Sequence, residues 1–503
     1  MGYLGYDPGH EPGERGRKRR SAGNGARWAV ALLVVAAVAA ALIYCDSRFV
    51  AIGGRIFERS DSAVDLRGAQ LDDLSPLYKF HALSSLDLRG CDVSAAEFDT
   101  LSERLPDCDI VWSVPLSFGS PDSTSEALSF AEAAESDFAM LGYFPSLAAL
   151  DASGCTCYAA ITDYAAAHPE CAVSWEVAIG GKTYGSGATA IALGAADAAE
   201  LELLQWLPAL EKIDCRGCTE YEKLLELYNT RPDCEVLWTA ELLGTSYDNT
   251  TGEIDISGTR ITDFDALAAQ LRNLPGLRKL YMFDCGQSNA QMDALLAQFP
   301  GIKFVWRVYF GIWSLRTDAT VFSTLNYDPP AYRLVDSEAE VLKYCTDLQV
   351  LDLGHNSLTS AAPFAGMTEL RVLILADNRI GDISVLSGLT KLVYLEMFIN
   401  RVSDISVLSG MPELRDVNFC WNRISDPSVL YTLPNIERIW MCGAQMSGET
   451  KRALMAALPD CEFDLYSYYG STNGTWRSHA RFYKIRAAVK GYNGLPGYSW
   501  DDA

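Results

Sequence analysis

The sequence predicts an α/β repeat solenoid: a curved stack of coils with a parallel sheet on its concave face, preceded by one transmembrane helix. Three observations carry this prediction. A nine-residue template recurs four times at a constant spacing of 22 residues, a second pattern recurs about every 63 residues upstream of it, and 18 consecutive residues near the N-terminus carry no charge. Fixed periods of this length are typical of solenoids, which build extended surfaces from stacked units.

The N-terminal part of the chain predicts a membrane anchor. Residues 1–27 are rich in Gly, Pro and charge, so we expect a basic, disordered cytoplasmic tail. As a helix, residues 28–45 would be about 27 Å long, close to the roughly 30 Å hydrocarbon core of a bilayer. Basic residues at 15–20 and at Arg27 favour a single pass through the cell membrane with the N-terminus inside and the solenoid outside. A cleaved secretory signal is the alternative, because Ala39–Ala41 offer small residues. Residues 46–60 are expected to be a linker.

Residues 61–344 carry the longer period. A P-x-C-x-φ-x-W segment, where φ is an apolar residue, ends at Trp112, Trp175 and Trp238, and a fourth copy without the Cys ends at Trp306. Because 63 is three times 21, we expect irregular repeats arranged as triplets of coils, with the recurrent tryptophans serving the fold. The nine-residue template occurs here with Cys at its last position, at Cys91, Cys155, Cys218 and Cys285.

Residues 345–445 form the regular block. The template L-x-x-L-x-L-x-x-N begins at Leu348, Leu370, Leu392 and Leu414. Its leucines are expected to point into the stack, while alternate strand residues point outward. The Asn that closes each copy is expected to bond the backbone of adjacent coils at a sharp turn.

These motifs resemble the leucine-rich repeat family, and within it the 22-residue repeats of bacterial internalins and SDS22-like proteins. Asn400–Leu408 (NRVSDISVL) is the most specific part of the resemblance. The resemblance implies that Cys can replace the template Asn and that the surface binds another macromolecule. Residues 446–503 are expected to form a C-terminal cap, rich in aromatic and basic side chains from about residue 462. A surface for cell-wall glycan is the alternative for this segment.

Composition and motifs argue against a catalytic, metal-binding or nucleic-acid-binding function. The net charge of −24 disfavours nucleic acid as a partner. The template accounts for most of the 14 cysteines as buried thiols, although disulfides or a metal site stay open as alternatives. Strand-borne carboxylates such as Asp87 and Asp352 are expected to form a solvated acidic ladder, with a Ca²⁺ site as the alternative. The five histidines are scattered, and no catalytic motif is present. We therefore expect no catalytic residue, no metal and no cofactor.

The outward strand positions of the regular block predict the binding face. Aromatic side chains at solvent-facing positions of successive coils are typical of interface anchors. The predicted partner-binding residues are Tyr394, Glu396, Phe398, Ile399, Trp421, Arg438 and Trp440. The alternative is that these rings pack on each other or under the C-terminal cap.

The sequence thus predicts a non-catalytic, membrane-anchored surface protein that binds another macromolecule, most readily a protein, through its concave face. Two other functions stay open. One is an intracellular regulatory scaffold of an enzyme, as in SDS22-like proteins. The other is a cell-wall glycan-associated protein or an unrecognised envelope hydrolase.

Overall fold

The structure is a computed structural model that describes residues 24–324, 332–468, 470 and 475–490. Most of the expected cytoplasmic tail, residues 1–23, lies outside the described residues. The chain divides into two compact units, Met1–Val236 and Leu237–Ala503, and each is described by itself.

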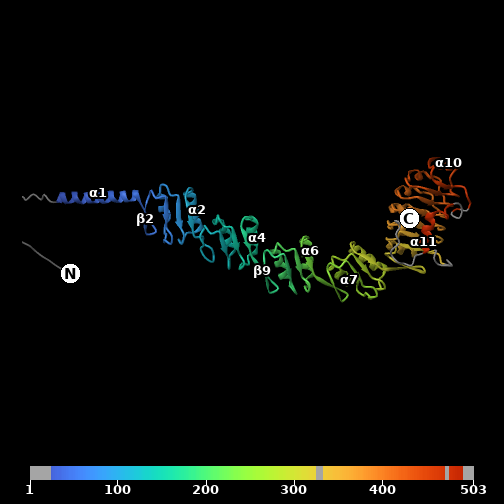
Figure 1. Cartoon of the computed structure of the whole chain (residues 1–503), viewed down its shortest axis with the longest axis horizontal. Coiled ribbons are helices and arrows are strands. Elements are labelled where there is room, and N and C mark those ends of the chain that lie inside the picture. Colours follow the sequence, from blue (N-terminus) through green and yellow to red (C-terminus); the bar gives the residue numbers. More distant parts are fainter. Residues whose placement is uncertain (1–23, 325–331, 469, 471–474, 491–503) are drawn as a thin grey trace, which may run out of the picture. The chain divides into compact units, whose positions relative to one another are not determined.

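The first unit begins with helix α1 (Asn24–Arg48), which is drawn in dark blue in Figure 1. Its span Trp28–Arg48 is long enough and apolar enough on average to cross a membrane, and none of its most apolar part is buried in the protein. The segment expected as a linker contains the hairpin β1 (Phe49–Ile52) and β2 (Arg55–Glu58). Gly53 and Gly54 turn it with positive φ angles, a conformation that glycine adopts without steric cost.

Three-stranded sheets recur with the long period. In the first unit the first sheet comprises β3 (Ala63–Asp65), β4 (Ser85–Leu88) and β5 (Asp109–Trp112). The next comprises β6 (Ala127–Ser129), β7 (Ala149–Asp151) and β8 (Ala172–Ser174). The third comprises β11 (Ala190–Ala192), β12 (Lys212–Asp214) and β13 (Glu235–Leu237). Each repeat of about 63 residues therefore contains one three-stranded sheet, and its three strands correspond to one triplet of coils.

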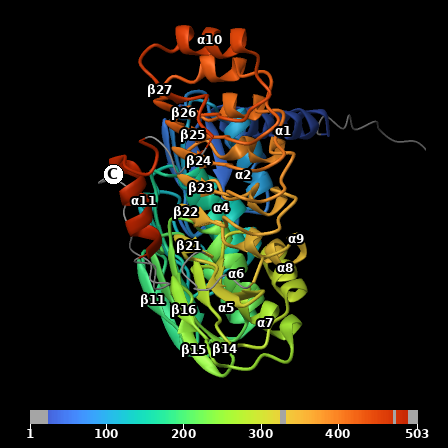
Figure 2. The same cartoon turned by 90° about the vertical axis from the view of Figure 1, so that its right-hand side faces the viewer.

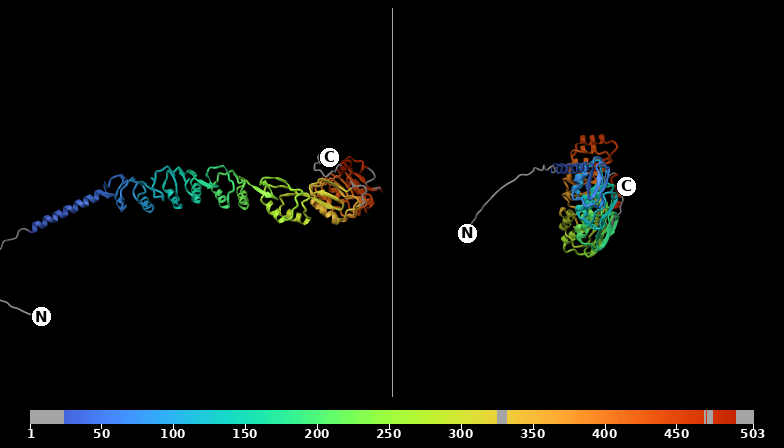
Figure 3. Two further views of the ribbon diagram at one scale, coloured as in Figure 1. Left: turned by 90° about the horizontal axis from the view of Figure 1, so that it is seen from below. Right: turned by 90° about the vertical axis from the view of Figure 1, so that its left-hand side faces the viewer.

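Short helices connect these strands and lie on one side of each sheet (Figure 3). The α-helices of the first unit are α2 (Ala95–Arg104), α3 (Glu135–Met140), α4 (Tyr158–Ala167), α5 (Ala198–Glu202) and α6 (Tyr221–Thr230). Ser94 caps α2 in a capping box with Glu97. The helices α2, α4 and α6 each end two residues before a proline, which cannot continue a helix.

A β-hairpin, which the sequence did not predict, follows three of the four triplet tryptophans. The hairpins are β9 (Glu176–Ile179) with β10 (Lys182–Gly185), β14 (Thr239–Leu242) with β15 (Thr245–Asp248), and β19 (Arg307–Phe310) with β20 (Trp313–Arg316). After Trp112 the same excursion is reduced to isolated bridges. The residues after the hairpin return a polar side chain that accepts a hydrogen bond from the backbone N–H of the tryptophan, as Asn249 Oδ1 does for Trp238 at 3.0 Å.

The second unit holds a fourth triplet and the regular block. The triplet comprises β16 (Glu253–Asp255), β17 (Lys279–Tyr281) and β18 (Lys303–Val305), with helices α7 (Phe264–Leu271) and α8 (Asn289–Gln298). The block is a seven-stranded parallel sheet, β21 (Val321–Ser323), β22 (Val350–Asp352), β23 (Val372–Ile374), β24 (Tyr394–Glu396), β25 (Asp416–Asn418), β26 (Arg438–Trp440) and β27 (Glu462–Asp464). The α-helix α9 (Asp336–Ala339) and single 3₁₀ turns such as Ser384–Gly388 and Ser406–Gly410 connect its strands.

The leucine core of the block lies on one side of its sheet. The central residue of each strand pairs in register with its neighbours, as Leu373 does with Leu351 and Leu395, and all three are fully buried. The template asparagines behave as predicted. Asn400 donates to the carbonyls of Leu375 at 2.8 Å and Met397 at 3.1 Å, and it accepts from the Ile380 N–H at 2.9 Å.

Cysteine replaces this asparagine in the triplets, as the resemblance implied. The Cys218 thiol lies 2.8 Å from the Gly194 carbonyl and accepts from the Ala196 N–H at 3.3 Å. Cys91, Cys155 and Cys285 contact carbonyls of the preceding coil in the same way. The triplet tryptophans are buried, which agrees with a role in the fold.

The C-terminal segment closes the second unit in two ways. Helix α10 (Gly448–Ala457) and strand β27 follow the last coil of the block. Helix α11 (Ala480–Lys490), drawn in red in Figure 2, instead turns back and lies along the outer face of the sheet. The C-terminal region therefore closes the end of the sheet, as the sequence predicted, and also covers part of its outer face.

Candidate partner-binding face

The predicted binding residues lie in two adjacent rows of the block sheet. One row, formed by the first residue of each strand, runs through Tyr394, Asp416 and Arg438. The other, formed by the third residue, runs through Glu396, Asn418 and Trp440. The strand register predicted from the template therefore brings Tyr394, Glu396, Arg438 and Trp440 onto one face.

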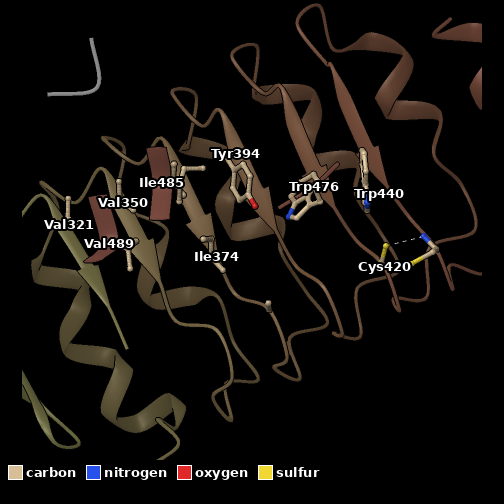
Figure 4. Packing of buried hydrophobic residues seen from close by; sticks show 12 residues of the cluster. Val321, Val350, Ile374, Tyr394, Cys420, Trp440, Trp476, Ile485 and Val489 are labelled. Carbon is tan, nitrogen blue, oxygen red and sulfur yellow. Dashed lines mark hydrogen bonds between the residues drawn. The ribbon is translucent and has the colours of Figure 1, made fainter. Parts of the chain in front are cut away.

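This face is not exposed to solvent, contrary to the expectation. Tyr394 and Trp440 have exposed fractions of 0% and 1%, because Trp476 lies between them with ring centroids 5.1 and 5.3 Å away (Figure 4). Trp476 is itself fully buried. Tyr394 and Trp440 therefore pack under the C-terminal segment, which was the alternative to a solvent-exposed binding face.

The predicted charged residues are buried with them. Glu396 accepts hydrogen bonds from the Tyr394 hydroxyl at 2.7 Å and from Trp476 Nε1 at 3.1 Å. Burial, followed by the neighbouring Glu396 carboxylate, raises the pKa of Tyr394 well above its ordinary value, so its hydroxyl stays a donor.

Arg438 belongs to a buried ionic network. Its guanidinium donates to both carboxylate oxygens of Asp416, at 2.9 and 2.7 Å, and to the Trp476 carbonyl at 3.3 Å. Arg481 donates to Asp416 at 2.5 Å and to Glu437 at 2.6 Å. Burial lowers the pKa of Arg481, but the hydrogen bonds and the negative charges of these two carboxylates together raise it by more, so Arg481 stays charged. Two arginines thus compensate one fully buried aspartate.

The remaining predicted residues lie at the edge where the strands end. Phe398 is partly buried and lies against Gly470. A Cβ at position 470 would lie only 2.2 Å from the Phe398 ring, so only glycine fits there. Ile399 and Trp421 are 41% and 38% exposed, as expected. Tyr468 stands against Trp421 with a centroid distance of 5.3 Å and an interplanar angle of 85°. We call Ile399, Trp421 and Tyr468 the edge patch.

The backbone at this edge is strained in a repeated way. The residue before each template Asn has a positive φ, at His355, Asp377, Ile399 and Trp421. This conformation is costly for a β-branched residue such as Ile399. Sequence reasoning placed Ile399 and Trp421 at the turn, and the turn is what projects their side chains outward.

The acidic ladder is only partly solvated. Asp65, Asp151 and Asp255 are exposed, whereas Asp352 is 4% exposed and receives hydrogen bonds from the Gly354 N–H and the Ser323 hydroxyl. Within the described ranges, no group of three or more His, Cys, Asp or Glu side chains could hold a metal ion. All 14 cysteines are free thiols in the structure.

Comparisons with known proteins agree with the repeat fold. The family model described as leucine-rich repeats (two copies) matches residues 368–410, inside the regular block. No protein with a curated description matches the chain.

Solved structures give weaker likenesses. An internalin (inlF) of Listeria monocytogenes is 16% identical, covers 82% of this chain and 84% of its own, and has a TM-score of 0.28. A leucine-rich repeat protein of Leptospira interrogans is 14% identical, covers 81% and 96%, and has a TM-score of 0.27. An internalin C2 of Listeria monocytogenes is 21% identical, covers 43% and 80%, and has a TM-score of 0.24.

The chain's own repeats define its fold. Its strands recur in register every 22 residues, its template asparagines bond successive coils, and two of its repeats match the family model. The chain has a leucine-rich repeat solenoid fold, and within it residues 368–410 match the leucine-rich repeat family model.

Proposed function

We propose that this chain is a single-pass membrane protein whose leucine-rich repeats bind another protein outside the cell without catalysing a reaction. Solenoids of this kind present extended surfaces that typically bind proteins. The observation that carries the proposal is the edge patch, where Ile399, Trp421 and Tyr468 expose large apolar or aromatic side chains at one edge of the block. Such rings anchor protein interfaces.

The orientation in the membrane rests on charge. The basic residues cluster before the apolar helix, and the part that follows is strongly acidic. Basic residues stay on the cytoplasmic side, so the repeats are placed outside. Protease added to intact cells should degrade the repeats while a cytosolic marker survives. Repeats that resist until the cells are lysed would instead favour the scaffold that SDS22-like proteins suggest.

The edge patch can be tested with a matched pair of variants. Trp421 and Tyr431 are exposed to similar extents, 38% and 42%, but Tyr431 lies in the 3₁₀ turn Ser428–Thr432, away from the edge patch. A photo-reactive amino acid placed at either position in living cells should cross-link a partner only from position 421.

The captured partner then supplies the affinity measurement. Trp421→Ala should weaken its binding by about 30-fold or more, the effect of losing a hot spot worth 2 kcal/mol, and Tyr431→Ala should leave it unchanged. Circular dichroism should report the same fold for both variants. Equal cross-linking from both positions, or equal affinity of both variants, would remove the edge patch from the proposal.

A further inference from the structure

The outer face of the block is covered, whereas the same face is open at the first strand of three triplets. In β3, β11 and β16 the first and third residues are exposed and only the central residue is buried. In every strand from β21 to β26, all three residues are buried. Because alternate residues of a strand lie on opposite faces, something must cover the outer face of the block.

The covering element is residues 475–490, which we call the cover segment. It contacts the sheet from β26 back to β21 (Figure 4). Trp476 fills the slot between Tyr394 and Trp440, and Ile485 and Val489 pack on an aliphatic surface that includes Val321, Val350 and Val372. Arg481 lies between them and binds the carboxylates of Asp416 and Glu437.

The spacing and charge of these contacts are those of an amphipathic ligand helix. Arg481, Ile485 and Val489 are four residues apart, so they share one face of α11. The cover segment holds five basic residues and no acidic residue, in a chain whose net charge is −24. Helices of this design bind in grooves through a few anchors on one face.

The leucine core does not depend on the cover segment. Leu351, Leu373 and Leu395 are fully buried on the opposite face of the sheet, beneath their own turns and the template asparagines. Removal of the cover segment would thus expose the outer rows and leave the core of the repeats in place.

The fit of the cover segment is also incomplete. Asn418 Nδ2 and Trp440 Nε1 are buried on the outer face and have no hydrogen-bond partner among the described residues. Buried donors without acceptors weaken a complex. A ligand that offered acceptors at these two atoms would compete well with the cover segment.

We propose that the cover segment is a displaceable intramolecular ligand, and that the face beneath it binds a basic amphipathic helix of a partner protein. An aromatic residue precedes that helix, and the helix presents on one face an arginine five positions after the aromatic residue and aliphatic residues nine and thirteen positions after it. The partner part of this proposal rests on the proposed function, since it names the kind of protein bound. Displacement itself is a property of this chain alone.

The test uses the full chain in detergent, with a protease site engineered between Gly470 and Thr475, and a fluorescent peptide of residues 475–490 as the probe. After cleavage, the released fragment should exchange with the peptide. A peptide with Arg481→Glu should bind at least 100-fold more weakly, because its carboxylate would face Asp416 and Glu437. The matched control is Arg486→Glu, which has the same composition and charge change at an exposed position. It should bind within about threefold of the unmodified peptide.

The uncut chain should bind the peptide about 10³-fold more weakly than the cut chain. A short tether holds its segment at an effective concentration near millimolar, which a micromolar ligand must overcome. Arg481→Glu in the uncut chain should restore most of the lost affinity. Equal binding of the two charge-reversed peptides, or loss of the cooperative unfolding transition when the fragment leaves, would overturn the proposal. Either result would leave cross-linking from position 421 unaffected, so failure here and failure of the proposed function are distinguishable.

Discussion

Replacement of Asn400 by alanine should destabilise the regular block by about 4 kcal/mol. Its carboxamide makes three buried hydrogen bonds, two as donor to Leu375 and Met397 and one as acceptor from Ile380. Both carbonyls are shared, because Leu375 also accepts from Asn378 and Met397 also accepts from Asn422. Only the Ile380 N–H would therefore lose its partner altogether.

The magnitude follows from this count. A buried N–H left without an acceptor costs roughly 1–3 kcal/mol, and each of the two lost donor bonds costs about 0.5–1.5 kcal/mol. The total is about 2–6 kcal/mol. Asn400→Cys should cost about half as much, because Cys218 shows that a thiol at this position can reach a carbonyl and accept from an N–H at once.

Urea unfolding of the block, followed by the emission of its tryptophans, measures both variants. Because solenoid stability is a sum over neighbouring coils, hydrogen exchange at the Ile380 amide should report the same order of stability locally. If the alanine and cysteine variants unfold within 0.5 kcal/mol of each other, the reasoning is refuted. The hydrogen bonds of the side chain at position 400 would then contribute nothing measurable to stability.

Two further predictions concern pH and packing. Burial raises the pKa of Asp352 to about 6 from an ordinary value of 3.8, so the stability that this group contributes is complete below pH 3.8 and is lost as pH rises through about 6. Asp352→Asn, which stays neutral, should therefore stabilise the block by up to about 3 kcal/mol at pH 7 and have little effect at pH 4. Urea unfolding at both pH values measures the change in stability. Equal effects at the two pH values would show that burial of the Asp352 charge is not the cause. Gly276→Ala should destabilise the second unit by about 1–3 kcal/mol, because the new Cβ would lie 2.4 Å from the Asn249 carbonyl oxygen. The control is Gly301→Ala, which also follows a proline but has open space around its Cβ position. Its free energy of unfolding in the same assay should lie within about 0.5 kcal/mol of wild type.

The sequence predicted the elements that repeat and missed those that depend on tertiary context. The strand register and the role of Asn400 follow from the spacing, because each coil meets an equivalent coil, whereas the role of Cys218 was implied by the resemblance to leucine-rich repeats. The hairpins after the triplet tryptophans were missed, although signals exist. Gly180 and Gly181 mark one turn, and a Ser, Asn or Thr stands 11 residues after each of the four tryptophans.

The cover segment was missed for a different reason. Arg481, Ile485 and Val489 are spaced as one face of a helix, but a helical face does not tell which surface it packs against. A terminal cap and a glycan-binding surface were both consistent with its composition. Its contacts with β21 and β22 span more than 100 residues of sequence, and no local pattern specifies them.

The composition of the outer rows, however, distinguishes a covered face from an open one. In the triplets most outer positions hold Ala, Ser or a charged residue, as at Ala190, Lys212 and Asp255, and these residues tolerate water. In the block the same positions hold Val350, Val372 and Tyr394, which bury apolar area only if a ligand lies on them. Aromatic and aliphatic side chains at outward solenoid positions therefore indicate a face that is occupied, and a complementary amphipathic helix within the same chain is the first occupant to consider. In this protein Tyr394 and Trp440, two of the rings predicted to bind a partner, instead pack against Trp476 of the chain's own cover segment.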